Sequence, residues 1–149
     1  MKEKNILPPT YLLIAMLLML ILHLAVPVVR FIPSPWHILG LVPLAFGIII
    51  NLAADSTYRR AGTTVKPFQE STALITDGVY RFSRHPMFLG FTAVLMGVAF
   101  LLRSLSSWLI VPIFAMLMEI IFIRVEERML EQKFCQDWLD YKRKVRRWI

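Results

Sequence analysis

The segment RHPMFLGFTAVLMGVAFLL, residues 84–102, joins a basic, histidine-containing turn directly to a long apolar run. The run lacks the polar alternation of a barrel strand and approaches the roughly 17 to 25 residues that a helix needs to cross a bilayer. Arg84 and His85 immediately precede the run, so we expect their side chains where lipid headgroups give way to hydrocarbon. This segment predicts a membrane-spanning helix that begins at a polar turn able to carry chemistry.

Three similar apolar runs lie elsewhere in the chain. Of its 149 residues, 57% are hydrophobic, and the mean hydropathy is +0.60, whereas soluble domains are roughly 45–50% apolar. Lipid cannot satisfy backbone polar groups, so the runs are expected to be helices. The first run is long for the apolar part of a signal peptide and precedes three more. We predict an all-α membrane protein, a single membrane domain over residues 1–149 with about four transmembrane helices, at 11–29, 36–54, 86–102 and 107–123.

The connections between these helices predict how they pair. Pro33-Ser34-Pro35 cannot continue a helix, and Arg103-Ser104-Leu105-Ser106 interrupts the last two apolar runs. Both connections are short, so we expect two tight antiparallel hairpins. Glycines recur at heptad spacing on the second and third helices, a pattern that favours close helix packing: Gly40, Gly47, Gly90 and Gly97.

The segments outside the spans are polar or amphipathic. Residues 55–85 form a mostly polar connection with two turn-like stretches. After Ile123 the chain becomes amphipathic, and its apolar residues recur at helical spacing: Val125, Met129, Leu130, Phe134, Trp138, Tyr141 and Val145. This pattern predicts an amphipathic helix over 124–149 that leaves the membrane and lies along its surface.

The distribution of charge predicts the orientation. The chain carries 17 Lys and Arg against 10 Asp and Glu, a formal net charge of +7. The basic residues gather before the first helix, between the second and third, and after the fourth, with only Arg30 and Arg103 in the other connections. They follow topology rather than a groove, so no nucleic-acid partner is expected. The positive-inside rule places both termini and residues 55–85 in the cytoplasm, on an inner or plasma membrane, facing anionic headgroups. The oligomeric state is left open.

Ionisable or strongly polar residues within the spans are costly and favour functional sites. Asn51 and Asp55 share one helix face, where Asp55 equally suits a local pair with Arg59. Glu119 precedes Glu126 by seven residues, so both are expected on nearly the same side of one helix, about 10 Å apart. The residues of this kind are His23, Asn51, Asp55 and Glu119.

Five motifs in order give this chain a family resemblance. It resembles the integral-membrane methyltransferases that include isoprenylcysteine carboxyl methyltransferase and the small phospholipid N-methyltransferases. The resemblance runs from about Asn51 to Trp148, roughly the C-terminal two thirds. Its motifs are Gly62-Thr63-Thr64 to Pro67, Thr76 to Tyr80, Arg84 to Gly90, Glu126-Glu127 with Leu130, and the tail from Phe134 to Trp148.

The resemblance implies a cofactor and the residues that hold it. In that family S-adenosylmethionine lies among the last helices near the cytoplasmic face. The cofactor-binding residues implied here are Arg84, His85, Pro86, Phe88, Gly90, Glu126 and Glu127. A Rossmann domain is excluded because none of the six glycines forms Gly-x-Gly. No metal site is expected.

The implied reaction transfers a methyl group to a lipid or other lipophilic acceptor. A carboxylate or thiolate acceptor calls for a cation, and Arg84 and Arg124 are the candidates. An amine or thiol calls for a base, and His85, Glu119 and Glu126 are the candidates. The acceptor itself stays open, because the N-terminal helices match nothing specific.

Three positions depart from the family pattern. Phe88 stands where Tyr is usual, which removes a hydroxyl but keeps an aromatic wall. Cys135, the single cysteine, stands where Gly is usual, which suggests that the tail turns differently. Trp138 stands where Tyr is common.

Two other functions are compatible with the sequence. Membrane sterol reductases carry a similar C-terminal segment and bind NADPH there, although they generally have more helices. A non-catalytic packing subunit is the other alternative, in which His85 and the glutamates only anchor helix ends. Binding of S-adenosylmethionine, of NADPH or of neither distinguishes the three.

Overall fold

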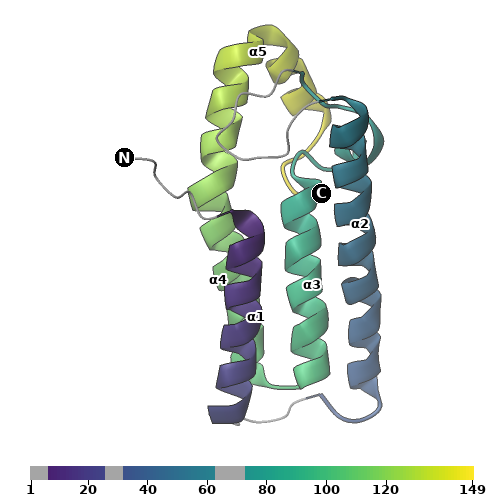
Figure 1. The fold of residues 1–149 in the computed structure, drawn as a ribbon, viewed down its shortest axis with the longest axis vertical. Helices are drawn as coiled ribbons and strands as arrows, with labels where there is room; N and C mark the ends of the chain where they lie inside the picture. Colours follow the sequence, from purple (N-terminus) through teal and green to yellow (C-terminus); the bar gives the residue numbers. More distant parts are fainter. Residues whose placement is uncertain (1–6, 26–31, 63–72) are drawn as a thin grey trace.

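The computed structural model describes residues 7–25, 32–62 and 73–149, and helices dominate these residues. The all-α prediction is therefore confirmed (Figure 1). The long helices are α1 (Pro8–Ala25), α2 (Leu41–Arg60), α3 (Pro86–Leu102), α4 (Leu105–Met118) and α5 (Arg124–Lys144). Shorter turns are the 3₁₀ helices η1 (Trp36–Gly40) and η2 (Gly78–Arg81) and the π-helical turn η3 (Glu119–Ile123).

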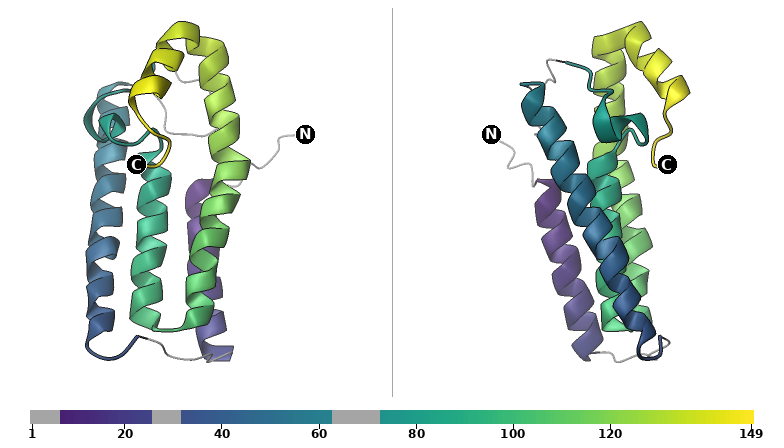
Figure 2. Two further views of the ribbon diagram at one scale, coloured as in Figure 1. Left: turned by 180° about the vertical axis from the view of Figure 1, so that it is seen from behind. Right: turned by 90° about the vertical axis from the view of Figure 1, so that its right-hand side faces the viewer.

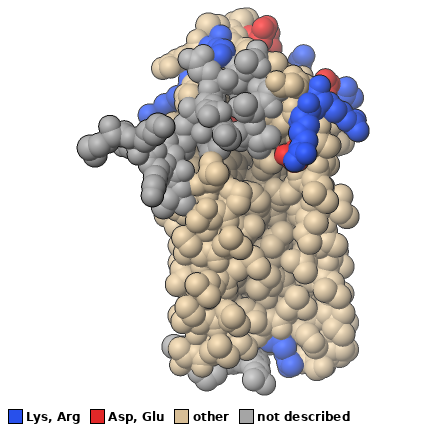
Figure 3. Space-filling model, in the orientation of Figure 1, with Lys and Arg blue, Asp and Glu red and all other residues tan. Residues whose placement is uncertain are grey.

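The lengths of these helices fit an integral membrane protein. Three are long and apolar enough to cross a bilayer: α1, the continuous helix Trp36–Arg60, and the apolar first part of Leu105–Lys144. The shorter α3 has 17 residues and completes the bundle. The second helix extends to Arg60, six residues beyond its predicted end at residue 54. Figure 3 shows Lys and Arg gathered at the end that carries α5, above an uncharged body with one small basic area at the opposite end.

The first of the two predicted hairpins is not tightly packed. Helix α2 packs along α3, while α1 packs against α4 and α3. In Figure 1, α3 lies between α1 and α2, although α1 and α2 are consecutive in the sequence. The α3 and α4 hairpin forms as expected.

Glycines explain why α2 prefers α3. A Cβ atom added at Gly47 would lie 2.5 Å from the Gly90 carbonyl oxygen, and one added at Gly97 would lie 2.6 Å from the Gly40 carbonyl oxygen. Only glycine permits backbones this close. The heptad glycines are thus packing residues of one helix seam.

The C-terminal amphipathic helix takes a different course from the one predicted. Its first half continues beyond the bundle roughly along the axis of α4, and the chain then turns back (Figures 1 and 2). The reversal is at Cys135, whose backbone has φ 43° and ψ −109°. Residues with a Cβ atom rarely adopt this backbone conformation, whereas glycine does so readily. Residues 124–149 therefore form a helical hairpin with a tail, which corrects the expectation of one helix along the surface.

The returning half of α5 covers the turn that precedes α3. Its apolar face buries Trp138 and Tyr141. The Tyr141 hydroxyl donates a hydrogen bond of 2.6 Å to the Tyr80 carbonyl oxygen. The amphipathic pattern identified the buried face correctly, but this face packs on protein.

Candidate active site

The start of α3 fixes the position of two candidate side chains. Pro86 is the first residue of the helix, where its missing N–H costs no hydrogen bond. The ring of a proline also keeps the preceding residue out of helical conformation, and His85 has φ −128° and ψ 59°. The His85 N–H donates to the Ser83 hydroxyl over 3.2 Å. Arg84 and His85 are therefore held on a defined turn at the helix entrance.

A buried carboxylate, Glu127, connects this turn to two other parts of the chain. Its Oε1 lies 3.0 Å from Arg84 Nη1, 3.3 Å from His85 Nε2 and 3.2 Å from Arg147 Nε. Its Oε2 accepts a 2.7 Å hydrogen bond from Arg147 Nη2. Burial alone would raise the pKa of Glu127, but the hydrogen bonds from His85 and Arg147 and the charge of Arg84 outweigh it and hold the pKa at about 2. Glu127 is therefore ionised and fixed.

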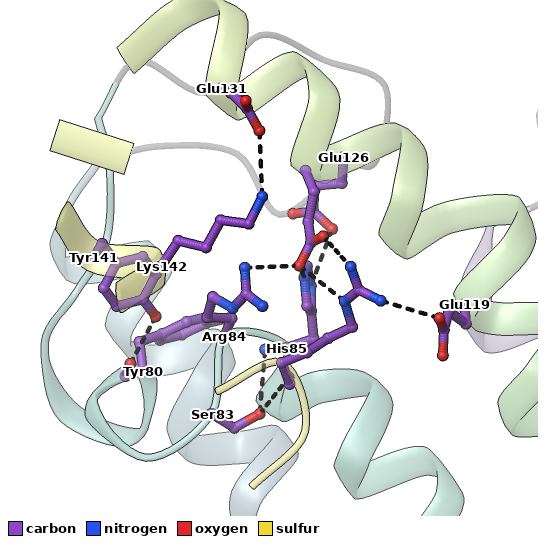
Figure 4. A network of polar contacts seen from close by, with 11 residues as sticks. Tyr80, Ser83, Arg84, His85, Glu119, Glu126, Glu131, Tyr141 and Lys142 are labelled. Carbon is purple, nitrogen blue, oxygen red and sulfur yellow. Dashed lines mark hydrogen bonds and ion pairs between the residues drawn. The ribbon is translucent and has the colours of Figure 1, made fainter. Parts of the chain in front are cut away.

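The imidazole of His85 lies between the carboxylates of Glu126 and Glu127. Figure 4 labels His85 and Glu126. Its Nδ1 is 3.6 Å from Glu126 Oε2, and its Nε2 is 3.3 Å from Glu127 Oε1. Burial works to lower the pKa of His85, and the two carboxylates raise it by more. A protonated ring has an N–H to offer to each carboxylate. In that state His85 donates protons and is not a general base.

The guanidinium of Arg84 is buried and incompletely satisfied. Its side chain is 7% exposed, and its carbon lies 5.7 Å from the centre of the Trp138 ring. Burial lowers the pKa of Arg84, and the charge of Glu127 opposes this. Nη1 forms the ion pair with Glu127, but within the described part of the chain neither Nη1 nor Nε makes a well-directed hydrogen bond. Buried donors of this kind are costly unless a ligand pairs with them.

A cavity of about 210 Å³ adjoins Arg84, His85 and Glu126. Its other walls are aromatic or apolar and come from the start of α1, the end of α2, η2 and the start of α3. Ligand pockets commonly measure roughly 300–1,000 Å³, so the part of this cavity that the described residues enclose is smaller than a typical ligand pocket. These walls include Pro8, Tyr58, Tyr80, Met87, Phe88 and Phe91.

The structure brings five of the predicted site residues to this cavity, namely Arg84, His85, Pro86, Phe88 and Glu126. Glu127 lies behind them and holds Arg84 and His85. Gly90 lies in the seam with α2, where an added Cβ would collide with Asn51.

Glu119 and Arg124 lie outside the cavity. Glu119 Oε1 is 3.0 Å from Arg147 Nη1 and 3.5 Å from Arg124 Nη2. Arg147 thus bridges Glu119 and Glu127. The sequence spacing predicts Glu126 on the side of Glu119, but Glu127 lies there instead. The π-helical turn from Glu119 explains the difference, because a π turn holds one residue more than an α turn.

Two of the three remaining intramembrane polar residues, Asp55 and Asn51, have local contacts. Asp55 pairs with Arg59 over 2.7 Å, as its alternative interpretation expected. The Asn51 amide donates to the Gly47 carbonyl oxygen over 2.8 Å. His23 is near the end of α1, far along the chain from the cavity-lining Pro8.

Sequence reasoning named the tail from Phe134 to Trp148 as a family motif but missed the role of Arg147 within it. The Arg84 N–H donates to the Arg146 carbonyl oxygen over 3.1 Å, and the Ser83 hydroxyl donates to that of Arg147 over 3.3 Å. From sequence, the last arginines were only part of the positive-inside charge. The one available signal was Cys135 at a position where glycine is usual.

Comparisons with known proteins agree with this fold. A family model described as phospholipid methyltransferase matches residues 35–137. The chain is 40% identical over 85 residues to protein-S-isoprenylcysteine O-methyltransferase of Saccharomyces cerevisiae. The aligned region covers 54% of this chain and 34% of that protein. It also resembles the solved structure of a eukaryotic intramembrane Ras methyltransferase, isoprenylcysteine carboxyl methyltransferase, with a TM-score of 0.73 and 22% identity, over 95% of this chain and 51% of that one.

The chain therefore spans about a third of the yeast relative and about half of the solved structure. At 22% identity the solved structure shows a shared fold. The family match, by contrast, covers well over half of this chain, including the turn before α3 and both glutamates. This chain belongs to the phospholipid methyltransferase family.

Proposed function

We propose that this protein transfers a methyl group from S-adenosylmethionine to an apolar or amphiphilic acceptor at the cytoplasmic side of the membrane. The observation that carries this proposal is the buried guanidinium of Arg84, of which Nε and Nη1 make no well-directed hydrogen bond among the described residues, beside a cavity that Glu126 also lines. The family membership supports the same reaction.

The charges at the cavity match those of the cofactor. S-adenosylmethionine carries a carboxylate, an ammonium group and a cationic sulfonium. Arg84 suits the carboxylate, since its donors pair with planar anions. Glu126, with a side chain 32% exposed, suits one of the cations. Phe88 offers an aromatic wall and stacks on Phe122 at a centroid distance of 6.0 Å.

When bound, S-adenosylmethionine supplies an electrophilic methyl group on its sulfonium. The residues of this chain bind the cofactor and the acceptor, orient them toward each other and exclude water. These are the main protein contributions to a displacement reaction. Glu127 and Arg147 hold Arg84 in place. The apolar walls keep water from the reacting atoms.

The state of His85 favours one kind of acceptor. Transfer to an amine or thiol releases a proton and needs a base, and a protonated His85 does not accept one, which leaves Glu126 as the one candidate base that lines the cavity among the described residues. A carboxylate is already ionised at neutral pH, so its methylation forms an O–C bond without moving any proton. We therefore favour a lipophilic carboxylate, in line with the name of the yeast relative, which indicates transfer to oxygen, and with that of the solved structure, a carboxyl methyltransferase.

Isothermal titration of the detergent-purified protein tests this function. We expect saturable binding of S-adenosylmethionine and S-adenosylhomocysteine, lost in Arg84→Ala and reduced in Glu126→Gln. Arg143→Gln is the control, because Arg143 is exposed and pairs only with Asp140 among the described residues. Binding of NADPH instead would favour the reductase, and binding of neither would favour a packing subunit.

A further inference from the structure

A second cleft lies between the two halves of α5 and the tail, and its lining shares no residue with the cavity beside Arg84. Its volume is about 370 Å³, which falls within the roughly 300–1,000 Å³ of ligand pockets. Four basic and two acidic residues line it: Arg124, Arg128, Lys142, Arg147, Glu127 and Glu131. The methyl-transfer proposal uses Glu127 and Arg147 only to hold Arg84 and gives the other four lining residues no role.

The carboxylates of the cleft are already engaged, whereas one of its cations, Arg128, forms no ion pair among the described residues and another, Arg124, pairs only with a carboxylate outside the cleft. Glu127 is paired with Arg147, and Glu131 lies 3.5 Å from Lys142. Arg128 is exposed and has no ion pair with any residue that the structure describes. Arg124 has only the 3.5 Å contact with Glu119 and is 57% exposed. The cleft therefore keeps a positive charge free for an anion.

The height of these arginines along the helix matches a headgroup layer. Arg124 and Arg128 follow Ile123, the last apolar residue of the span, by one and five positions. At a rise of roughly 1.5 Å per residue they lie about 1.5 and 7.5 Å beyond it. The headgroup region is roughly 5 to 7.5 Å thick on each side of the hydrocarbon. Both guanidinium groups are thus within reach of lipid phosphates.

We propose that this cleft binds the phosphate of an anionic phospholipid headgroup, held by Arg124 and Arg128 with Lys142 on the opposite wall. Guanidinium groups pair well with phosphate oxygens. A zwitterionic headgroup brings its own cation into a cleft that is already positive, so an anionic lipid is favoured. This inference stands independently of the methyl-transfer reaction.

The test compares lipids on the detergent-purified full chain by native mass spectrometry. The probes are phosphatidylglycerol, phosphatidylcholine and inorganic phosphate. We expect saturable binding of phosphatidylglycerol in preference to phosphatidylcholine. Each cation near a membrane surface contributes roughly fivefold, so Arg124→Gln with Arg128→Gln should weaken the binding roughly 30-fold.

The matched control is Arg143→Gln with Lys144→Gln, which removes the same charge outside the cleft. It should weaken the binding less than the cleft pair by about tenfold. Helix content by circular dichroism checks that every variant is folded, and Arg128→Gln alone provides a milder variant.

Three outcomes overturn the proposal. Equal losses in the two double variants mean that the lipid responds only to overall charge. No preference for phosphatidylglycerol over phosphatidylcholine removes the anionic lipid. If inorganic phosphate binds saturably, this binding is lost in Arg124→Gln with Arg128→Gln, and phosphatidylglycerol is not preferred over phosphatidylcholine, the ligand is free phosphate.

Discussion

Arg147 and Glu127 form a two-point ion pair although they are 20 residues apart, with Nε to Oε1 at 3.2 Å and Nη2 to Oε2 at 2.7 Å. The pair closes the hairpin of α5 onto the turn before α3. Because Glu127 also contacts Arg84 and His85, the geometry of the cavity depends on a residue that does not line it.

Replacing Arg147 should therefore weaken cofactor binding without removing any cavity-lining side chain. Glu127 would lose both hydrogen bonds from Arg147 and draw Arg84 away from the cavity. We expect Arg147→Ala to reduce affinity for S-adenosylhomocysteine roughly 10- to 100-fold, in line with about 1.5–3 kcal/mol for charged hydrogen bonds. Arg147→Lys should recover part of the loss. Arg146→Ala, which keeps the backbone carbonyl, is the control in titration calorimetry, and equal affinity of Arg147→Ala and this control would contradict the idea.

The depressed pKa of Glu127 predicts how stability depends on pH. Its pKa of about 2 lies below the ordinary value of 4.5, so its stabilising contribution is complete above about pH 4.5 and is lost as the pH falls toward 2. The shift corresponds to about 3 kcal/mol. Glu127→Gln should be less stable at pH 7 and lose less further stability on acidification. Thermal unfolding in detergent between pH 7 and pH 3 measures this, and parallel curves for both proteins would refute it.

The raised pKa of His85 gives a separate prediction. Its contribution to stability is complete below its ordinary pKa of 6.5 and is lost as the pH rises through the higher folded value. In NMR spectra of ¹³C-labelled histidine, the His85 signal should titrate above pH 6.5, and Glu126→Gln should move that titration downward. His85→Gln assigns the signal among the three histidines. A ring that is neutral at pH 6.5 would remove the argument for a carboxylate acceptor.

Cys135 offers a substitution that should stabilise the protein. Its backbone has a positive φ of 43°, an angle that glycine adopts without steric cost. Cys135→Gly should therefore increase the free energy of unfolding by about 1 kcal/mol. Cys135→Ala keeps the Cβ and should give no such gain, so the two thermal midpoints together isolate the backbone effect. Lower stability for the glycine variant would show that the conformation is not strained.

Much of the fold followed from the sequence because its signals are local. Four apolar runs of spanning length, the proline and serine connections and the heptad glycines depend only on neighbouring residues. Arg84, His85 and Glu126 were likewise recognised from motifs. The course of the tail was not, because it depends on one backbone angle at Cys135 and on contacts between residues about 60 positions apart, such as Tyr141 with Tyr80. The α1 packing was missed for a similar reason, since adjacency in sequence says little about which helix face fits best.

The π-helical turn at Glu119–Ile123 sets the rotation of everything that follows it. Each residue of an α-helix advances the chain by roughly 100°. Deleting one residue within this turn would rotate α5 by about that angle, carry Glu126 and Glu127 off their partners, and leave the composition of the helix nearly unchanged. Insertions and deletions at 119–123 are therefore far more damaging to this site than substitutions at most positions of α5.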